Sequence, residues 1–250
     1  SHGRVGLDGK PYLRSGALLT GVDFDTSAIL FLGANDIALE KLVEAKPDLI
    51  LTTVGRPTPI EALERIAPTV ALDAATLGAP HVYEKLAEPT GTEARLAVLE
   101  HRYRSGIAAL KQAVDPSAIT VSVFQPLNGK ISTYHTYRSL GRVLRDAGFR
   151  FPALIDGIAP GGRIEVSAER LPEFDADFIF DPCRSDTGDT SDKEIAAMEK
   201  VLPGFCAFLK ACREGRYVMV SREEAISNSY AALFLMTATV QATVANRPAP

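Results

Sequence analysis

A stretch of five residues in the second half of the chain concentrates ring and cationic side chains. Tyr134, His135, Tyr137 and Arg138 fall within it, although aromatic residues make up only 7% of the 250-residue chain. Phenol rings offer flat faces with a hydrogen-bonding tip, and a guanidinium group forks onto paired oxygen atoms in a fixed plane. These groups could hold a large organic anion. Alternatively, the tyrosines cover a neighbouring hairpin, and His135 is an ordinary hydrogen-bonded surface histidine.

Further arginines stand shortly after segments that are predicted to be β-strands. Arg56 follows the apolar run Leu49 to Thr53, and Arg184 follows the run Phe178 to Asp181 in the matching position. Loops at the carboxyl ends of parallel strands are where α/β sheets commonly bind ligands. Each arginine could equally be a solvated loop residue. Two more candidates, nearer the end of the chain, are Arg222 and Tyr230.

Patterns typical of catalysis or of metal binding are weak throughout the chain. The sequence has no GxSxG, HExxH or GxxxxGKS/T motif, so we expect neither an enzyme nor a cofactor. The acids around Cys183 do not follow the spacing of a calcium loop and indicate a solvated loop. Cys183, Cys206 and Cys212 are odd in number and lack a CxxC spacing, which predicts neither a disulfide framework nor a zinc site.

The composition is that of a globular protein without a strong electrostatic bias. Hydrophobic residues make up 46% of the chain, charged residues 23%, and the net charge is -4. No stretch concentrates Lys and Arg enough to follow a phosphate backbone, so nucleic acid is not expected as a partner. The apolar run Ala231 to Met236 is too short to cross a bilayer, and the first residues lack the features of a signal peptide.

Two segments in different halves of the chain share one pattern. Leu39 to Leu51 and Val166 to Phe180 are each predicted to form a short polar helix, a turn with an acid, and a wholly apolar strand. We expect the first strand, from Leu49, in a sheet that is covered on both faces. A helix over Ile60 to Ile66 and a strand over Thr69 to Leu72 would complete a parallel βαβ unit. The repeated pattern predicts two similar α/β lobes.

Two further elements link these lobes and open the second. The longest helical pattern runs from Gly91 to about Val114. At about 1.5 Å per residue such a helix would be long enough to join two lobes. Asn128-Gly129, between the predicted strands Ile119 to Phe124 and Lys130 to Thr133, predicts a β-hairpin.

The ordered succession of these motifs is more specific than any one of them. The first half contains LEKLVEAKPDLIL, a glycine-containing loop and IEALERIAPTV. The second half continues with the Asn128-Gly129 hairpin, Ser139-Leu140, Ala147-Gly148-Phe149 and the segment Val166 to Leu171. Over roughly residues 35 to 245 this order resembles the ferric-siderophore-binding proteins of bacterial ABC importers, a cluster that also holds cobalamin- and haem-binding proteins.

The resemblance implies two Rossmann-like α/β lobes joined by a single long α-helix. The N-terminal lobe would span residues 1–91, the helix 92–114 and the C-terminal lobe 115–250. Residues 1–34 are too short and irregular to supply the strand and helix with which the family usually opens, so we expect a truncated or divergent first lobe.

The resemblance also implies that an iron(III) siderophore binds in the cleft between the lobes. Arginine and tyrosine side chains would favour an anionic chelate over a neutral one. Haem, cobalamin or another metal chelate, and an α/β enzyme acting on a siderophore, remain alternatives. The expected ligand contacts are Arg56, Tyr134, His135, Tyr137, Arg138, Arg184, Arg222 and Tyr230.

A membrane permease is the implied partner. In the family, one exposed glutamate in each lobe pairs with permease arginines, and the matching positions are Glu61 and Glu169. Either residue could instead be an ordinary solvated glutamate of a helix. We expect a monomer in the periplasm or at the cell envelope, in contact with the membrane only through the permease or through a lost lipid anchor.

Overall fold

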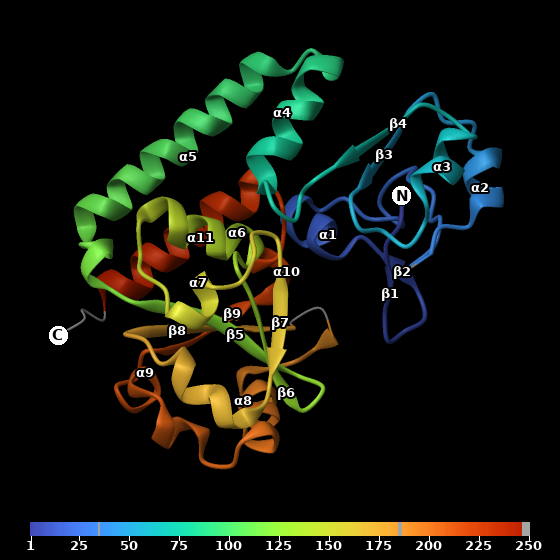
Figure 1. Ribbon diagram of the computed structural model, residues 1–250. Helices are drawn as coiled ribbons and strands as arrows, with labels where there is room; N and C mark the ends of the chain where they lie inside the picture. Colours follow the sequence, from blue (N-terminus) through green and yellow to red (C-terminus); the bar gives the residue numbers. More distant parts are fainter. Residues whose placement is uncertain (35, 185–186, 247–250) are drawn as a thin grey trace. The chain divides into compact units, whose positions relative to one another are not determined.

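The computed structural model describes residues 1–34, 36–184 and 187–246 (Figure 1). The chain divides into two compact units, Ser1–Ala74 and Ala75–Pro250, which are called unit 1 and unit 2 below. Both units combine helices with β-strands, as the sequence predicts. The division into lobes at residues 1–91 and 115–250, with residues 92–114 as their linker, stays a prediction.

Unit 1 is built from short elements. They are β1 (Arg4–Val5), β2 (Pro11–Tyr12), α1 (Arg14–Thr20), α2 (Leu39–Glu44), β3 (Ile50–Thr53), α3 (Ile60–Glu64) and β4 (Thr69–Leu72). Strands β1 and β2 pair antiparallel, whereas β3 and β4 pair in parallel with Leu51 opposite Val70. The order β3, α3, β4 confirms the predicted parallel βαβ unit.

The expectation that β3 is covered on both faces is wrong. Ile50 packs with Leu42 and Leu63 in a small core. Leu51 and its partner Val70 are 48% and 40% exposed. Successive residues of a strand point to opposite faces, so the face with Leu51 and Val70 is largely exposed, although Leu72 at its end is buried.

Unit 2 contains a five-stranded mixed sheet with the order β7-β6-β5-β8-β9. Its strands are β5 (Val121–Leu127), β6 (Lys130–Tyr134), β7 (Arg163–Val166), β8 (Phe178–Cys183) and β9 (Tyr217–Ser221). β5, β8 and β9 run parallel, and β6 is antiparallel to both of its neighbours. Asn128 and Gly129 have φ angles of 52° and 73°, as a tight hairpin turn requires, which confirms the predicted hairpin.

Helices cover both faces of this sheet (Figure 1). On one side lie α5, α6 and α11, with Leu110, Leu140 and Leu233 fully buried; on the other lie η2 and α8, with Phe174 and Met198 fully buried. The helices of unit 2 are α4 (Gly78–Thr90), α5 (Glu93–Ala113), η1 (Pro116–Ala118), α6 (Arg138–Ala147), α7 (Ala153–Asp156), η2 (Ala168–Phe174), α8 (Ser191–Val201), η4 (Phe205–Phe208), α9 (Lys210–Arg213), α10 (Arg222–Ala225) and α11 (Tyr230–Ala245).

The long predicted helix is present as α5, and its bounds differ from the prediction by one or two residues. It packs on α11 and α6. The sequence gives no such signal for α4, because Pro80 and Pro89 argue against a continuous helix, yet both lie in its terminal turns. Within the described ranges, no helix is both long enough and apolar enough to span a membrane.

The sequence predicts no disulfide framework, yet the structure contains one disulfide. Cys206 and Cys212 are joined, with their Cα atoms 5.1 Å apart. The bond connects η4 to α9 on the side of the sheet that η2 and α8 cover. Cys183 keeps a free thiol, and burial raises its pKa.

Candidate functional site

Two of the predicted arginines leave the unit 2 sheet side by side. Strands β8 and β9 run parallel, with Cys183 opposite Ser221. Arg184 and Arg222 are the next residues along each strand, and both are half-buried. Carboxyl ends of parallel strands form one edge of a sheet, where ligands commonly bind. We call this region the arginine edge. It comprises Arg184, Arg222, Gln125, Tyr137, Tyr134, Arg138 and Arg163.

A glutamine of the central strand β5 anchors the arginine edge. Gln125 is 6% exposed, and its Oε1 accepts hydrogen bonds from Tyr137 Oη at 2.7 Å and from Arg222 Nε at 3.2 Å. Buried amide groups need such partners. The bond from Arg222 Nε fixes the orientation of Arg222 and uses only one of the donors on its guanidinium group.

Tyr137 is a core residue, contrary to the expectation that it contacts a ligand directly. Its side chain is 1% exposed, and burial raises the pKa of its phenol, which therefore stays protonated as a donor to Gln125. The ring packs edge-on against Tyr134 at 5.2 Å. Tyr137 thus supports the exposed parts of the arginine edge and positions Arg222 through Gln125.

Tyr134 contacts two guanidinium groups. Arg138 Cζ lies 5.6 Å from the ring centroid and Arg163 Cζ lies 5.9 Å from it. Arg163 stands opposite Tyr134 in the β6–β7 pairing, and a hydrogen bond with Tyr134 raises the pKa of its guanidinium. Arg163 also pairs with Glu165 at 2.5 Å. The half-buried phenol and the two cations form a surface suited to an anion that also carries flat organic groups.

Arg138, at the start of α6, has a strained backbone conformation. Its φ angle is 43°, in the left-handed region that arginine rarely adopts and that often marks functional sites. Its Nη1 donates to the carbonyl oxygen of Ala75 at 2.9 Å. A Cβ at Gly141 would lie 3.0 Å from the carbonyl carbon of Thr136, so the loop before Arg138 sits tightly on α6. Arg138 therefore has both a structural bond and a ring contact.

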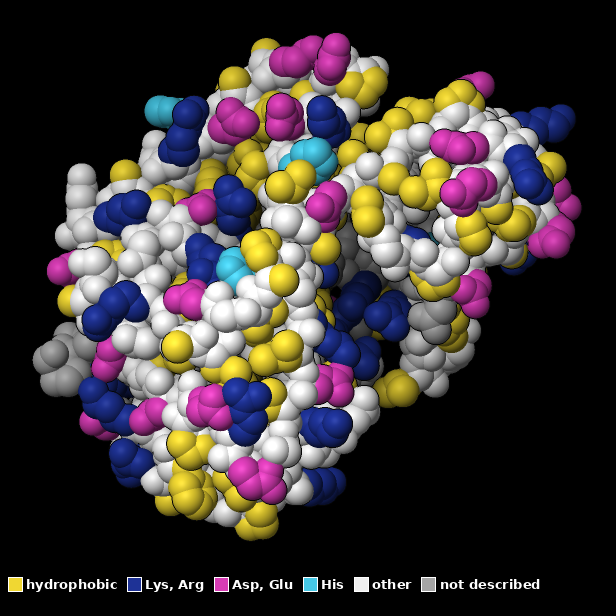
Figure 2. All heavy atoms as spheres, viewed as in Figure 1, with side chains coloured by type: hydrophobic (Ala, Val, Ile, Leu, Met, Phe, Trp, Pro, Cys, Tyr) yellow, Lys and Arg dark blue, Asp and Glu magenta, His cyan; other side chains and the backbone are white. Residues whose placement is uncertain are grey.

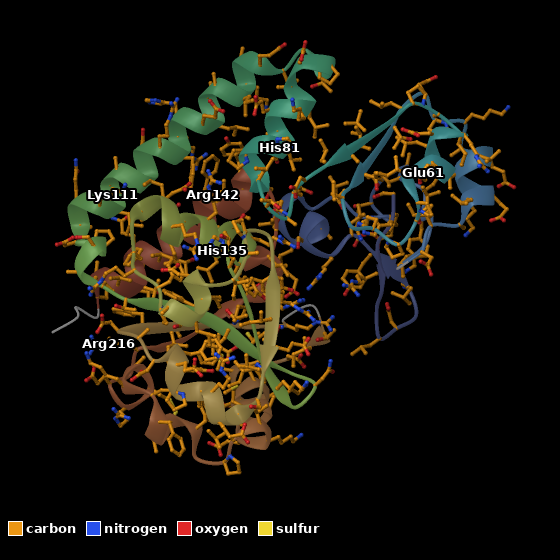
Figure 3. The ribbon with its side chains drawn as sticks, in the orientation of Figure 1. Glu61, His81, Lys111, His135, Arg142 and Arg216 are labelled. Atoms are coloured by element: carbon orange, nitrogen blue, oxygen red, sulfur yellow. A yellow bond between two sulfur atoms is a disulfide. The ribbon has the colours of Figure 1, made fainter. Side chains whose placement is uncertain are left out.

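His135 fits the alternative of a hydrogen-bonded histidine. Its Nδ1 lies 2.9 Å from Thr136 Oγ1. Its backbone oxygen accepts from Arg145 Nε and Nη2 at 3.0 and 2.7 Å. Burial and the nearby charge of Arg145 lower the pKa of His135, so the ring is mostly neutral at pH 7. Figure 3 shows His135 close to α6.

Tyr230 has different neighbours from the other predicted ligand contacts. It begins α11, is 2% exposed, and packs edge-on against Tyr83 and Tyr103 with centroid distances of 5.1 and 6.3 Å. Burial raises its pKa to about 12. Tyr230 lines a cavity of about 240 Å³ whose described lining includes none of the side chains of the arginine edge. Tyr230, a predicted ligand contact, therefore lies among other tyrosines.

In unit 1, Arg56 lines an open pocket of about 230 Å³ that follows β3. Its Nε donates to Thr53 Oγ1 at 3.1 Å. Gly55 supplies the turn before it with a φ angle of 82°, which favours glycine. Thr52 and Thr58 add polar groups to the pocket wall.

The two candidate docking glutamates are both exposed. Glu61 lies on α3 and lines the Arg56 pocket (Figure 3). Glu169 lies at the start of η2 in unit 2, where a hydrogen bond from Ser167 lowers its pKa. Both carboxylates can reach an approaching protein.

Missed by the sequence analysis are Gln125 and Arg163. Each belongs to the site because of strand pairing or a contact with a distant side chain, and neither lies in a recognisable sequence motif. Metal-binding clusters of His, Cys, Asp or Glu are absent from residues 1–34, 36–184 and 187–246. The described groups of the arginine edge are guanidinium, phenol and amide, which bind oxygen-rich anions.

Acidic and basic side chains are interspersed over α4 and α5 on the face that Figure 2 shows.

The fold and the arginine edge define a ligand-binding protein of the α/β type. Residues 18–207 match the family described as periplasmic binding protein, and the chain belongs to that family.

One curated relative is the iron(3+)-hydroxamate-binding protein FhuD of Bacillus subtilis (strain 168). The two sequences are 32% identical over 154 residues, which are 57% of this chain and 48% of that protein. The chain therefore spans about half the length of the curated relative that it matches.

Solved structures with the same fold confirm the predicted α/β class. FhuD2 of Staphylococcus aureus with bound ferrioxamine B aligns with a TM-score of 0.69 and 22% identity, covering 94% of this chain and 89% of that one. SirA of Staphylococcus aureus aligns with a TM-score of 0.71 and 18% identity, covering 99% and 90%. SirA complexed with staphyloferrin B gives a TM-score of 0.69 and 20% identity, covering 90% and 79%. At these identities the likeness concerns the fold.

Proposed function

We propose that this chain is the substrate-binding component of an ABC importer and that it captures a ferric siderophore for delivery to a membrane permease. The observation that carries the proposal is the arginine edge, where Arg184 and Arg222 leave adjacent strands and Tyr134 contacts Arg138 and Arg163. Membership of the periplasmic binding protein family and the iron(3+)-hydroxamate named for the FhuD relative support it. The family binds its substrates, so no catalytic step is assigned.

The ligand class follows from the charge of the arginine edge. The arginine edge carries four guanidinium groups, with Glu165 paired to Arg163 and the carboxyl of Glu194 near Arg222. An anionic chelate, with carboxylate or catecholate oxygens, would gain bidentate bonds there that a neutral chelate cannot make. A neutral ferric hydroxamate would depend mainly on ring contacts with Tyr134. The proposal is therefore an anionic ferric siderophore, with hydroxamates as the weaker class.

Unit 1 would supply the second half of the site through Arg56 and the threonines around it. In the proposal, residues 1–91 and 115–250 act as two lobes, residues 92–114 link them, and the chelate lies between them. His135 would then lie at the margin of the site, because its hydrogen bonds serve the loop before α6. Tyr230 would contribute through packing rather than contact.

The delivery step would use one exposed glutamate in each unit, Glu61 and Glu169. Each exposed ion pair with a permease arginine is weak alone, so the two would set the orientation of docking more than its strength. The protein would act as a monomer in the periplasm or at the cell envelope, where a permease can meet it.

Titration of the chain with ferric siderophores tests this function. The chain has seven tyrosines and no tryptophan, so quenching of tyrosine fluorescence reports binding. We expect saturable quenching by at least one ferric siderophore, with carboxylate or catecholate chelates tighter than hydroxamates, and none by the iron-free ligands at the same concentration. Haem and cobalamin serve as comparison ligands. A folded chain that shows no saturable quenching by any ferric siderophore contradicts the proposal, and tighter binding of haem or cobalamin would reassign the ligand.

A further inference from the structure

A pocket of unit 2 lies apart from the arginine edge, among α4, α5, α6 and α11. We call it the α5–α6 pocket. Its volume is about 240 Å³. The described residues that line it are Pro80, Glu100, Tyr103, Arg104, Arg142, Asp146 and Tyr230. Figure 3 shows Arg142 near α5 and α6.

The floor of the α5–α6 pocket is aromatic and rigid. Tyr103 is 7% exposed and Tyr230 is 2% exposed, and their rings pack edge-on. Tyr103 Oη donates to Asp146 Oδ2 at 3.0 Å, and Arg142 Nε donates to the same oxygen at 2.8 Å. Burial raises the pKa of Tyr103, so this phenol remains a donor at neutral pH. These bonds satisfy Asp146 and fix the floor before any ligand arrives.

The rim carries both signs of charge. Glu100 and Arg104 stand one turn apart on α5, and in the described part of the chain neither has a hydrogen bond or ion pair. Arg142 uses Nε for Asp146. Its two terminal nitrogens bring further donors to the rim. The pocket therefore combines Glu100 and Arg104 with the Arg142–Asp146 ion pair, above an aromatic floor.

We propose that the α5–α6 pocket binds a small zwitterion, a free amino acid with an apolar or aromatic side chain. Arg104 and Arg142 would hold its carboxylate, because guanidinium groups pair with carboxylates in a fixed plane. Glu100 would hold its ammonium group. The side chain would lie against the small exposed parts of Tyr103 and Tyr230.

Size and charge balance both favour this class of ligand. Sites for drug-sized molecules occupy roughly 300 to 1,000 Å³, so this pocket suits a smaller one. A simple anion would leave Glu100 facing a like charge, and a simple cation would face Arg104 and Arg142. A zwitterion alone pairs with both sides of the rim. This site is independent of the proposed siderophore site, since their described lining residues differ.

Three related probes separate these possibilities: L-phenylalanine, 3-phenylpropionate, which lacks the ammonium group, and 2-phenylethylamine, which lacks the carboxylate. Each is titrated to about 20 mM while tyrosine ring NMR signals are followed, which detects a Kd in the millimolar range. We expect saturable shifts with L-phenylalanine and at least about tenfold weaker binding of either single-charge analogue, since one rim partner is lost.

Two rim residues, the half-buried Glu100 and the exposed Arg104, provide matched variants. Glu100→Gln and Arg104→Gln should each weaken L-phenylalanine binding about fivefold or more. Glu93→Gln and Lys111→Gln remove the same charges elsewhere on α5, and Figure 3 shows Lys111 near its carboxyl end; they should leave binding unchanged. Siderophore quenching is measured on the same samples and should be unaffected by all four changes.

Three outcomes would overturn the proposal. They are the absence of saturable shifts with L-phenylalanine, equal binding of a single-charge analogue, and equal weakening by the control variants. If the unaltered protein binds no siderophore, the results with L-phenylalanine are still valid. The two proposals can therefore be contradicted independently.

Discussion

The carboxyl group of Glu194 lies against that of Asp181 inside unit 2. Asp181 belongs to β8 and is fully buried, and Glu194 belongs to the first turn of α8 and is 9% exposed. Tyr217 Oη donates to Asp181 Oδ2 at 2.5 Å, whereas Asp181 Oδ1 has no hydrogen-bond partner in the described part of the chain. Two adjacent buried carboxyls cannot both ionise easily. Burial raises the pKa of each, that of Glu194 to about 7.

This pair makes stability depend on pH. An unfolded glutamate titrates near pH 4.3, so the folded chain binds more protons than the unfolded chain from about that pH up to about 7. Stability is therefore greatest at the acidic end of this window and falls as the pH rises through it. Thermal unfolding at several pH values should show Tm falling toward pH 8, and Glu194→Gln should flatten that fall. The exposed Glu84→Gln is the control; an equal fall in all three proteins would contradict the assignment.

Removal of one cation should weaken the binding of an anionic chelate selectively. Arg184→Gln should cost about 1.5 to 3 kcal/mol of binding free energy, or roughly 10- to 150-fold in Kd, because a charge-assisted bond is lost. A neutral ferric hydroxamate should lose much less. Arg170→Gln, on an arginine paired with Glu173 on η2, is the matched control. Tyrosine quenching measures all of these affinities. Equal losses for charged and neutral chelates would show that Arg184 does not select by charge.

Reversal of charge at the two exposed glutamates should separate binding from transport. Glu61→Arg and Glu169→Arg should each reduce siderophore uptake severalfold, since each would face permease arginines with a like charge. Glu169→Arg should leave chelate affinity unchanged. Glu61→Arg needs its own affinity measurement, because Glu61 shares a pocket with Arg56. Glu64→Arg, on the same helix, is the control. Normal uptake with both variants would exclude docking through these residues.

The Cys206–Cys212 disulfide should contribute measurably to stability. Closing a loop this short in the unfolded chain corresponds to about 2 kcal/mol in the chain-entropy treatment. Cys212→Ser should lower the free energy of unfolding by about that amount in denaturant titrations without reductant. With reductant present, both proteins should unfold at nearly the same denaturant concentration. A difference that survives reduction would point to packing instead of the bond.

Much of the fold follows from the apolar pattern. Leu39 to Leu51 and Val166 to Phe180 become α2 with β3 and η2 with β8, because a continuous apolar run between turn residues has few alternatives to a sheet strand. Arg184 and Arg222 were predictable for the same reason. Each immediately follows such a strand, and adjacent parallel strands bring their next residues to one edge.

What escaped prediction depends on contacts between distant residues. Gln125 matters because Tyr137 and Arg222 both reach it, and Arg163 matters because β7 pairs with β6 opposite Tyr134. The local sequence does not show which residue of a neighbouring strand will pair with a given position. The burial of Tyr137 was not predictable for the same reason, because its neighbours in the sequence do not distinguish it from an exposed loop tyrosine.

The small sheet of unit 1 also sets how this part of the molecule opens. Because one face is largely exposed and few side chains are buried, β3 and β4 should exchange their amide hydrogens through local opening. This exchange should come well before that of β5 and β8, which are paired on both sides and buried on both faces. A ligand that touches Arg56 would slow that exchange. The protection of β3 amides is therefore a direct measure of whether unit 1 participates when a chelate binds.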